Sequence, residues 1–85
     1  FKPSSEAPLI GLRLVEAFVA AGIPSGVLNF ITGNSSVVGP VITRSKEIRA
    51  ISFTGSTRVG EEIHRNASLT TRTQMELGFG RGFNY

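Results

Sequence analysis

Residues 54–57 (Thr-Gly-Ser-Thr) have the residue types and the position of a phosphate-binding turn. They lie between a β-rich run and a helical pattern, so a helix begins there with unpaired backbone N–H groups and the positive end of its dipole. Gly55 lets a phosphate approach the backbone closely, and Ser56 can donate a hydrogen bond. The alternative is an ordinary helix start in which the hydroxyl of Ser56 or Thr57 serves only as a cap. Position alone favours the cap.

Two other side chains could take part in chemistry. Glu76 follows a strand-like run and could act as a general base, although a solvated carboxylate is the simpler interpretation of the residue alone. His64, the single histidine, has no second residue at metal-ligand spacing, so we expect a solvated helix position and predict no metal site. The chain contains no cysteine, which excludes thiol chemistry within it and a disulfide-built scaffold.

The elements that must position these residues alternate along the chain. Ser5 is expected to cap a first helix that has Pro8 in its first turn and ends at Gly22. Ser36 is expected to cap a second helix that has Pro40 in its first turn. The second helix is predicted over about 37–44 and a third over about 57–67, with strands over 27–32, 49–53 and 71–77.

This alternation predicts an α/β fold, a partial doubly wound, Rossmann-like parallel sheet of three strands alternating with three helices. Parallel strands are normally covered by helices on both faces of the sheet. Three strands and three helices are too few to complete this cover. The pattern is therefore that of an interior part of a larger domain. Residues 78–85, rich in glycine and aromatic side chains, have no strand or helix period.

Composition narrows the function classes. The chain is 40% hydrophobic and 18% charged, an ordinary globular balance, and no apolar run reaches the roughly 20 residues of a membrane span. We therefore expect no membrane association and a cytoplasmic location. The net charge of +3 suits a phosphate-bearing ligand. Glycine, arginine and aromatic residues in the tail could stack on single-stranded nucleic acid, but one such unit is thin evidence, and no nucleic-acid partner is predicted.

Four motifs, in order, resemble those of the aldehyde dehydrogenase superfamily. Residues 2–8 resemble the segment K-P-S-E-x-T-P, and residues 21–29 resemble the turn A-G-[IVL]-P-x-G-V-x-N. Residues 51–60 match I-x-F-T-G-S-T-x-V-G, and residues 75–78 resemble the start of L-E-L-G-G-K. Together they cover residues 2–78 and are specific as a set.

The resemblance implies that residues 1–78 are part of a domain that binds NAD or NADP, with residues 79–85 as an atypical tail. In the family pattern Lys2 would hold the adenosine ribose or a 2′-phosphate, and Gly33 would border the adenine cleft. The same pattern implies pyrophosphate contact by Gly55 and Ser56, adenine packing by Val59, and a backbone position near the nicotinamide for Leu77.

Ser5 falls where many NAD-preferring members have a glutamate that binds the ribose diol. A carboxylate repels a 2′-phosphate, whereas Ser5 beside Lys2 tolerates it. We therefore predict that NADP is accepted, even preferred, although the adjacent Glu6 could turn toward the ribose.

The resemblance also implies an activity, the oxidation of an aldehyde to a carboxylic acid through a cysteine thioester. Glu76 matches the general base that activates water for thioester hydrolysis. The nucleophilic cysteine and the asparagine of the oxyanion hole are not in this chain, and Phe79 and Gly80 replace the family's second glycine and lysine.

We therefore expect a fragment of such an enzyme, with no turnover by itself and with unpaired sheet edges that weaken its fold. The alternative is a non-catalytic dinucleotide-binding remnant. Whole members of the family commonly form dimers or tetramers, which implies a homo-oligomer for the full-length enzyme.

Overall fold

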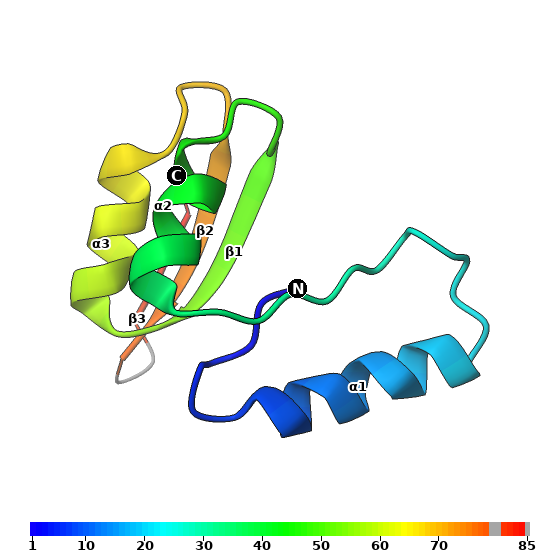
Figure 1. The fold of residues 1–85 in the computed structure, drawn as a ribbon. Coiled ribbons are helices and arrows are strands. Elements are labelled where there is room, and N and C mark those ends of the chain that lie inside the picture. The colour runs from blue at the N-terminus through cyan, green and yellow to red at the C-terminus, as the bar shows by residue number, and fades with distance from the viewer. Residues whose placement is uncertain (79–80, 85) are drawn as a thin grey trace. The chain divides into compact units, whose positions relative to one another are not determined.

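The computed structural model describes residues 1–78 and 81–84, and Figure 1 shows their elements. The chain divides into two compact units, Phe1–Ser35 and Ser36–Tyr85. None of the helices in the described part of the chain is long and apolar enough to cross a membrane. The elements are α1 (Pro8–Ala20), α2 (Ser35–Arg44), β1 (Ala50–Gly55), α3 (Thr57–Asn66), β2 (Arg72–Leu77) and β3 (Arg81–Asn84).

Helix α1 begins and ends with two different residue types that favour those positions. Pro8 is the first helical residue, where its missing N–H costs nothing. The expected cap at Ser5 is wrong, because the N-cap is Ala7 and no side chain caps the helix. Gly22 ends the helix as predicted, since it adopts the left-handed φ of 97° and its N–H donates to the carbonyl of Val19 at 3.0 Å.

The strand expected over residues 27–32 does not form. Its backbone makes two hydrogen bonds with the first residue. The N–H of Ile31 donates to the carbonyl of Phe1 at 3.0 Å, and the amino terminus of Phe1 donates to the carbonyl of Asn29 at 2.7 Å. The rings of Phe1 and Phe30 lie 5.9 Å apart, and α1 packs against this pair of segments at Gly11, where an added Cβ would lie 3.3 Å from the Phe30 ring. A strand needs a ladder of hydrogen bonds to a neighbouring strand, and the described residues of this unit supply none.

Helix α2 begins at Ser35, earlier than predicted, and this changes the position of its proline. Pro40 lies inside the helix and not in its first turn as expected. A proline there has no N–H to donate to the carbonyl four residues earlier, so one helical hydrogen bond is missing. Thr43, in the last turn, is buried.

The second unit contains a three-stranded sheet in the order β1-β2-β3. Strands β1 and β2 are parallel, with Gly55 level with Leu77 at their carboxyl ends, which confirms the predicted α/β class. Strand β3, which follows in the tail, pairs antiparallel with β2. The prediction of an irregular tail is therefore wrong over Arg81–Asn84. Without β3, the N–H and C=O groups on this edge of β2 would be unpaired, and the chain folds back to pair them.

The core of the second unit lies between β2 and α3. Thr73, Met75 and Leu77 alternate along β2 and are buried, with Met75 fully enclosed. Helix α3 packs on this face at Gly60, where an added Cβ would overlap with the side chain of Leu77. The missing side chain at Gly60 therefore sets how closely α3 approaches the sheet.

Candidate functional site

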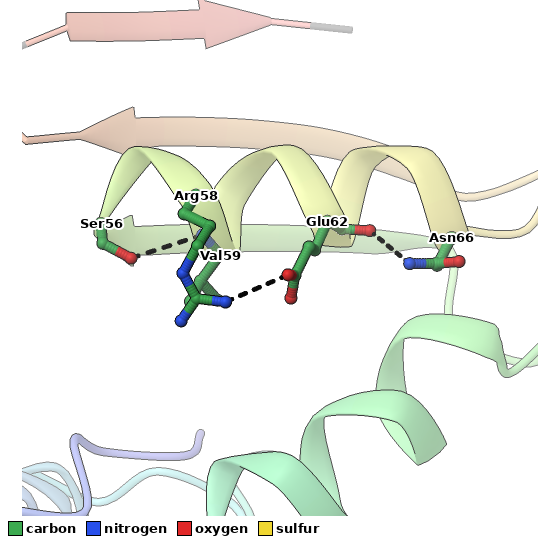
Figure 2. A network of polar contacts seen from close by, with 5 residues as sticks. All are labelled: Ser56, Arg58, Val59, Glu62 and Asn66. Atoms are coloured by element: carbon green, nitrogen blue, oxygen red, sulfur yellow. Dashed lines mark hydrogen bonds and ion pairs between the residues drawn. The ribbon is translucent and has the colours of Figure 1, made fainter.

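The start of α3 presents its backbone N–H groups beside the hydroxyl of Ser56. Ser56 is the N-cap, and its Oγ accepts a hydrogen bond from the N–H of Val59 at 3.3 Å (Figure 2). Its carbonyl accepts from the N–H of Gly60 at 3.0 Å. A hydroxyl that accepts in a cap keeps its own proton to donate. The cap predicted as the simpler alternative is present, and it leaves Ser56 able to donate to an anion at the same time.

A backbone hydrogen bond joins the carboxyl ends of the parallel strands β1 and β2, next to the start of α3. The N–H of Gly78 donates to the carbonyl of Gly55 at 3.0 Å. The turn that starts α3 therefore lies beside the end of β2, which carries Glu76 and Leu77. Ligands of α/β sheets bind outside the carboxyl ends of the strands, next to helix N-termini. The turn with Ser56 and the strand end with Glu76 thus lie side by side, at the edge of the sheet where such ligands bind.

Gly55 has a packing role that the sequence did not predict. A Cβ at this position would lie 2.6 Å from Cζ of Phe53, closer than real side chains approach one another. A larger residue at Gly55 would therefore make the ring of Phe53 shift, whether or not a phosphate approaches the turn. The glycine by itself is weak evidence for a ligand, and the strand-end geometry is the stronger observation.

Glu76 and Leu77 point to opposite faces of β2. Leu77 is 3% exposed and lies under α3, so only its backbone can face a ligand, as the family pattern implies. Glu76 is exposed on the other face, where its Oε1 accepts a hydrogen bond from Nε2 of Gln74 at 3.0 Å. Gln74 was not predicted from the sequence, because a single polar residue within a strand does not by itself indicate a function.

The first unit contains a hollow of about 230 Å³ that brings together residues distant in the sequence. Ser5 and Gly33, which the family pattern assigns to the adenosine half of the coenzyme, both line it. Sequence reasoning missed Thr32, which also contributes to the wall and lies just before Gly33 without a motif of its own. The remaining lining residues are Pro3, Ser4 and Pro8.

Lys2 supplies a positive charge next to this hollow. Its Nζ donates to the carbonyl of Pro3, a lining residue, at 3.2 Å and to Oγ of Ser35 at 3.1 Å. Lys2 is thus hydrogen-bonded to Pro3, which lines the hollow together with Ser5.

The predicted site residues fall into two groups, one in each unit. Lys2, Ser5 and Gly33 belong to the first unit, and Ser56 and Glu76 belong to the second.

His64 contacts Oγ1 of Thr73 through Nδ1 at 3.2 Å. Within residues 1–78, no three histidine or acidic side chains are grouped so that they could hold a metal ion.

Comparison with known proteins extends these observations to a family. The model of the aldehyde dehydrogenase family matches residues 1–81. The chain is 45% identical over 80 residues to 2,5-dioxopentanoate dehydrogenase of Saccharolobus solfataricus, a match that covers 91% of this chain and 17% of the relative. It is 47% identical over 78 residues to D-glyceraldehyde dehydrogenase (NADP(+)) of Picrophilus torridus, covering 91% of this chain and 16% of the relative.

A solved structure agrees with the sequence relatives. NADP-dependent glyceraldehyde-3-phosphate dehydrogenase of Bacillus halodurans, complexed with NADP, superposes with a TM-score of 0.85 at 38% identity over 92% of this chain and 16% of that one. The chain thus spans about a sixth of the length of the proteins that it matches. On the family match, the shared motifs and this fold, the chain belongs to the aldehyde dehydrogenase family.

Proposed function

We propose that residues 1–78 serve an NAD(P)-dependent aldehyde dehydrogenase as part of its coenzyme-binding domain, in the oxidation of an aldehyde to a carboxylic acid. The observation that carries this proposal is the hydrogen bond between Gly78 and Gly55, which joins the anion-binding start of α3 to the strand end that bears Glu76. The coenzyme, when bound, accepts the hydride that the substrate loses. The thiol nucleophile comes from outside this chain, which has no cysteine.

In this function Glu76 removes a proton from water, and the resulting hydroxide attacks the thioester carbonyl, releasing the acid and the thiolate. The N–H groups after Gly55 and the hydroxyl of Ser56 bind the pyrophosphate. Val59 lies one turn further along α3, on the side proposed for the adenine, and the backbone of Leu77 lies toward the nicotinamide.

The coenzyme is proposed to be NADP, with NAD as the second choice. The hollow of the first unit has a neutral hydroxyl at Ser5 and an ammonium group at Lys2 beside it, which together suit a 2′-phosphate. Glu6, which could have opposed this, is exposed and does not line the hollow. Two relatives, from Picrophilus torridus and Bacillus halodurans, are NADP enzymes by name.

The proposal can be tested in a graft enzyme, in which residues 1–78 of this chain replace the segment that they match in the Picrophilus torridus relative. Reduction of NADP by the host's substrate, D-glyceraldehyde, is the expected result. Circular dichroism and the host's oligomeric state establish that the graft enzyme folds. A folded graft enzyme that binds NADP but forms no NADPH supports the non-catalytic remnant, and one that does not bind NADP contradicts the proposal.

Substitution of Ser56 separates the cap from coenzyme binding. Ser56→Ala removes the cap, at a cost of about 1 kcal/mol of stability, and the hydroxyl donor as well. Ser56→Asp keeps a good N-cap but places a negative charge where the pyrophosphate binds. We expect the aspartate variant to be as stable as the graft enzyme and to bind NADP at least roughly tenfold more weakly, as measured by titration calorimetry. Unchanged NADP affinity in Ser56→Asp would show that Ser56 only caps the helix.

Substitution of Ser5 tests coenzyme preference. Ser5→Glu places a carboxylate in the hollow, where it repels a 2′-phosphate and can accept hydrogen bonds from a ribose diol. We expect kcat/KM for NADP to fall roughly tenfold or more, equivalent to about 1.4 kcal/mol, while that for NAD holds or rises. Ser25→Glu, which adds the same charge in an exposed turn away from the hollow, is the matched control. Equal losses in both variants would point to overall charge and not to the hollow.

A further inference from the structure

Three polar side chains form a hydrogen-bonded row on the face of the sheet opposite α3. Oγ of Ser52 donates to Oε1 of Gln74 at 2.8 Å, and Nε2 of Gln74 donates to Oε1 of Glu76 at 3.0 Å. Ser52 and Gln74 are direct neighbours across the parallel strands β1 and β2. The row therefore ends on the carboxylate proposed as the general base.

The backbone holds Gln74 and Glu76 on one face. They are two residues apart in β2, so their side chains project from the same side of the sheet. The residue between them, Met75, is fully buried on the other side, and Thr73 and Leu77 are buried with it. Rotation of the strand would expose this core, so the relative position of the two polar side chains is firmly set.

The chemistry of the amide gives the row a direction. An ionised carboxylate only accepts hydrogen bonds, so the NH₂ end of Gln74 must face Glu76. The carbonyl end of the amide then faces Ser52, whose hydroxyl can donate to it. If the amide were reversed, two oxygens would oppose each other at Glu76. Ser52 thus supports the orientation in which Gln74 donates to the carboxylate.

We propose that Gln74 is a positioning residue for Glu76, held in its donating orientation by Ser52. The inference rests on the proposed function, because it matters only if Glu76 is the base. A carboxylate that must remove a proton from one water works best when its plane is held, and Gln74 restrains one of its two oxygens. Gln74 acts through Glu76 and is not assigned a contact with substrate or coenzyme.

The test uses Gln74→Leu in the graft enzyme, a change that keeps a comparable side-chain size but removes both ends of the amide. Hydrolysis of the acyl-enzyme is expected to slow about fivefold to tenfold, the effect of one net hydrogen bond. NADPH formation in the first turnover is expected to stay within twofold, because it precedes hydrolysis and does not use the base. Arg72→Gln, on the same face and strand but outside the row, is the matched control, with no change expected.

Two further measurements separate positioning from a structural role. Hydroxylamine attacks the thioester without help from a base, so it is expected to restore turnover both in Gln74→Leu and in Glu76→Gln. Addition of Gln74→Leu to Glu76→Gln is expected to slow hydrolysis less than twofold further, because residues that act as one unit are not additive. If Gln74→Leu does not fold, Ser52→Ala, a small change at an exposed site, carries the test with an expected slowing of about threefold.

The outcomes distinguish this inference from the proposed function. If Glu76→Gln slows hydrolysis but Gln74→Leu and Ser52→Ala leave it within twofold, the inference is wrong and Glu76 remains the base. Equal losses in first-turnover NADPH formation and in hydrolysis for Gln74→Leu, with no rescue by hydroxylamine, also overturn it. If Glu76→Gln itself leaves hydrolysis unchanged, the proposed function fails first.

Discussion

Replacement of Glu76 by glutamine in the graft enzyme is expected to slow hydrolysis of the acyl-enzyme by about 10²- to 10⁴-fold, the usual contribution of a general base. Glutamine has nearly the same size and can still contact Gln74, but it cannot take a proton from water. First-turnover NADPH formation, which precedes hydrolysis, is expected to persist. Rapid mixing with D-glyceraldehyde would therefore show a burst of one NADPH per active site, followed by a slow steady state.

The position of Glu76 explains why this loss should be confined to one step. Its carboxylate is exposed at the carboxyl end of β2, on the face away from the packed core, so removal of its charge leaves Met75 and Leu77 in place. Glu47→Gln, an exposed carboxylate in the loop before β1, is the control and should leave every step unchanged. A steady state of Glu76→Gln within fivefold of the graft enzyme would remove the main catalytic assignment.

Replacement of Gly60 by valine is expected to have the largest effect on stability. Even a Cβ at this position would overlap with the side chain of Leu77, which is itself buried and cannot move into solvent. Overpacking of this kind costs typically about 1–3 kcal/mol, and valine adds two further methyl groups to the Cβ. Urea unfolding of the graft enzyme, followed by circular dichroism, would measure the loss as a lower midpoint.

The same change should also weaken coenzyme binding, because α3 carries Ser56 at its start and cannot move away from β2 without displacing it. Leu77→Ala, combined with Gly60→Val, makes room and is expected to recover part of the midpoint. Gly39→Ala in α2, where an added Cβ meets no atom within 4 Å, is the control and should be neutral or slightly stabilising. A midpoint for Gly60→Val equal to that of the control would show that α3 does not pack as described.

Local residue patterns were sufficient to predict most of the elements. The helical spacing of α1, with Pro8 in its first turn and Gly22 at its end, is contained within one segment, and the structure confirms this helix although not its cap at Ser5. The parallel pairing of β1 and β2 followed from their alternation with helices. The motifs also located the turn at Ser56 and the carboxylate at Glu76, because short motifs of this kind are contiguous in the chain.

Elements that depend on a distant partner could not be predicted in this way. The residues of the run 27–32 have strand propensity, but a strand forms only beside another strand. In this unit the run has only the single residue Phe1 beside it, which makes one backbone bond with Ile31 and one with Asn29. The opposite error occurred in the tail, where glycine-rich residues pair with the edge of β2 as β3. In both cases the outcome was decided by which neighbour was available and not by the residues of the segment.

From sequence alone, therefore, the family and the α/β class could be predicted for this protein, and candidate coenzyme-binding and base residues could be named. Tertiary structure alone showed that Gly55 and Gly78 are hydrogen-bonded, that Ser5 and Gly33 share one hollow, and that Gln74 donates to Glu76. The physical reason is that hydrogen bonds and hollows join atoms far apart in the chain, and their formation depends on how helices and strands pack, which no local pattern of residues specifies.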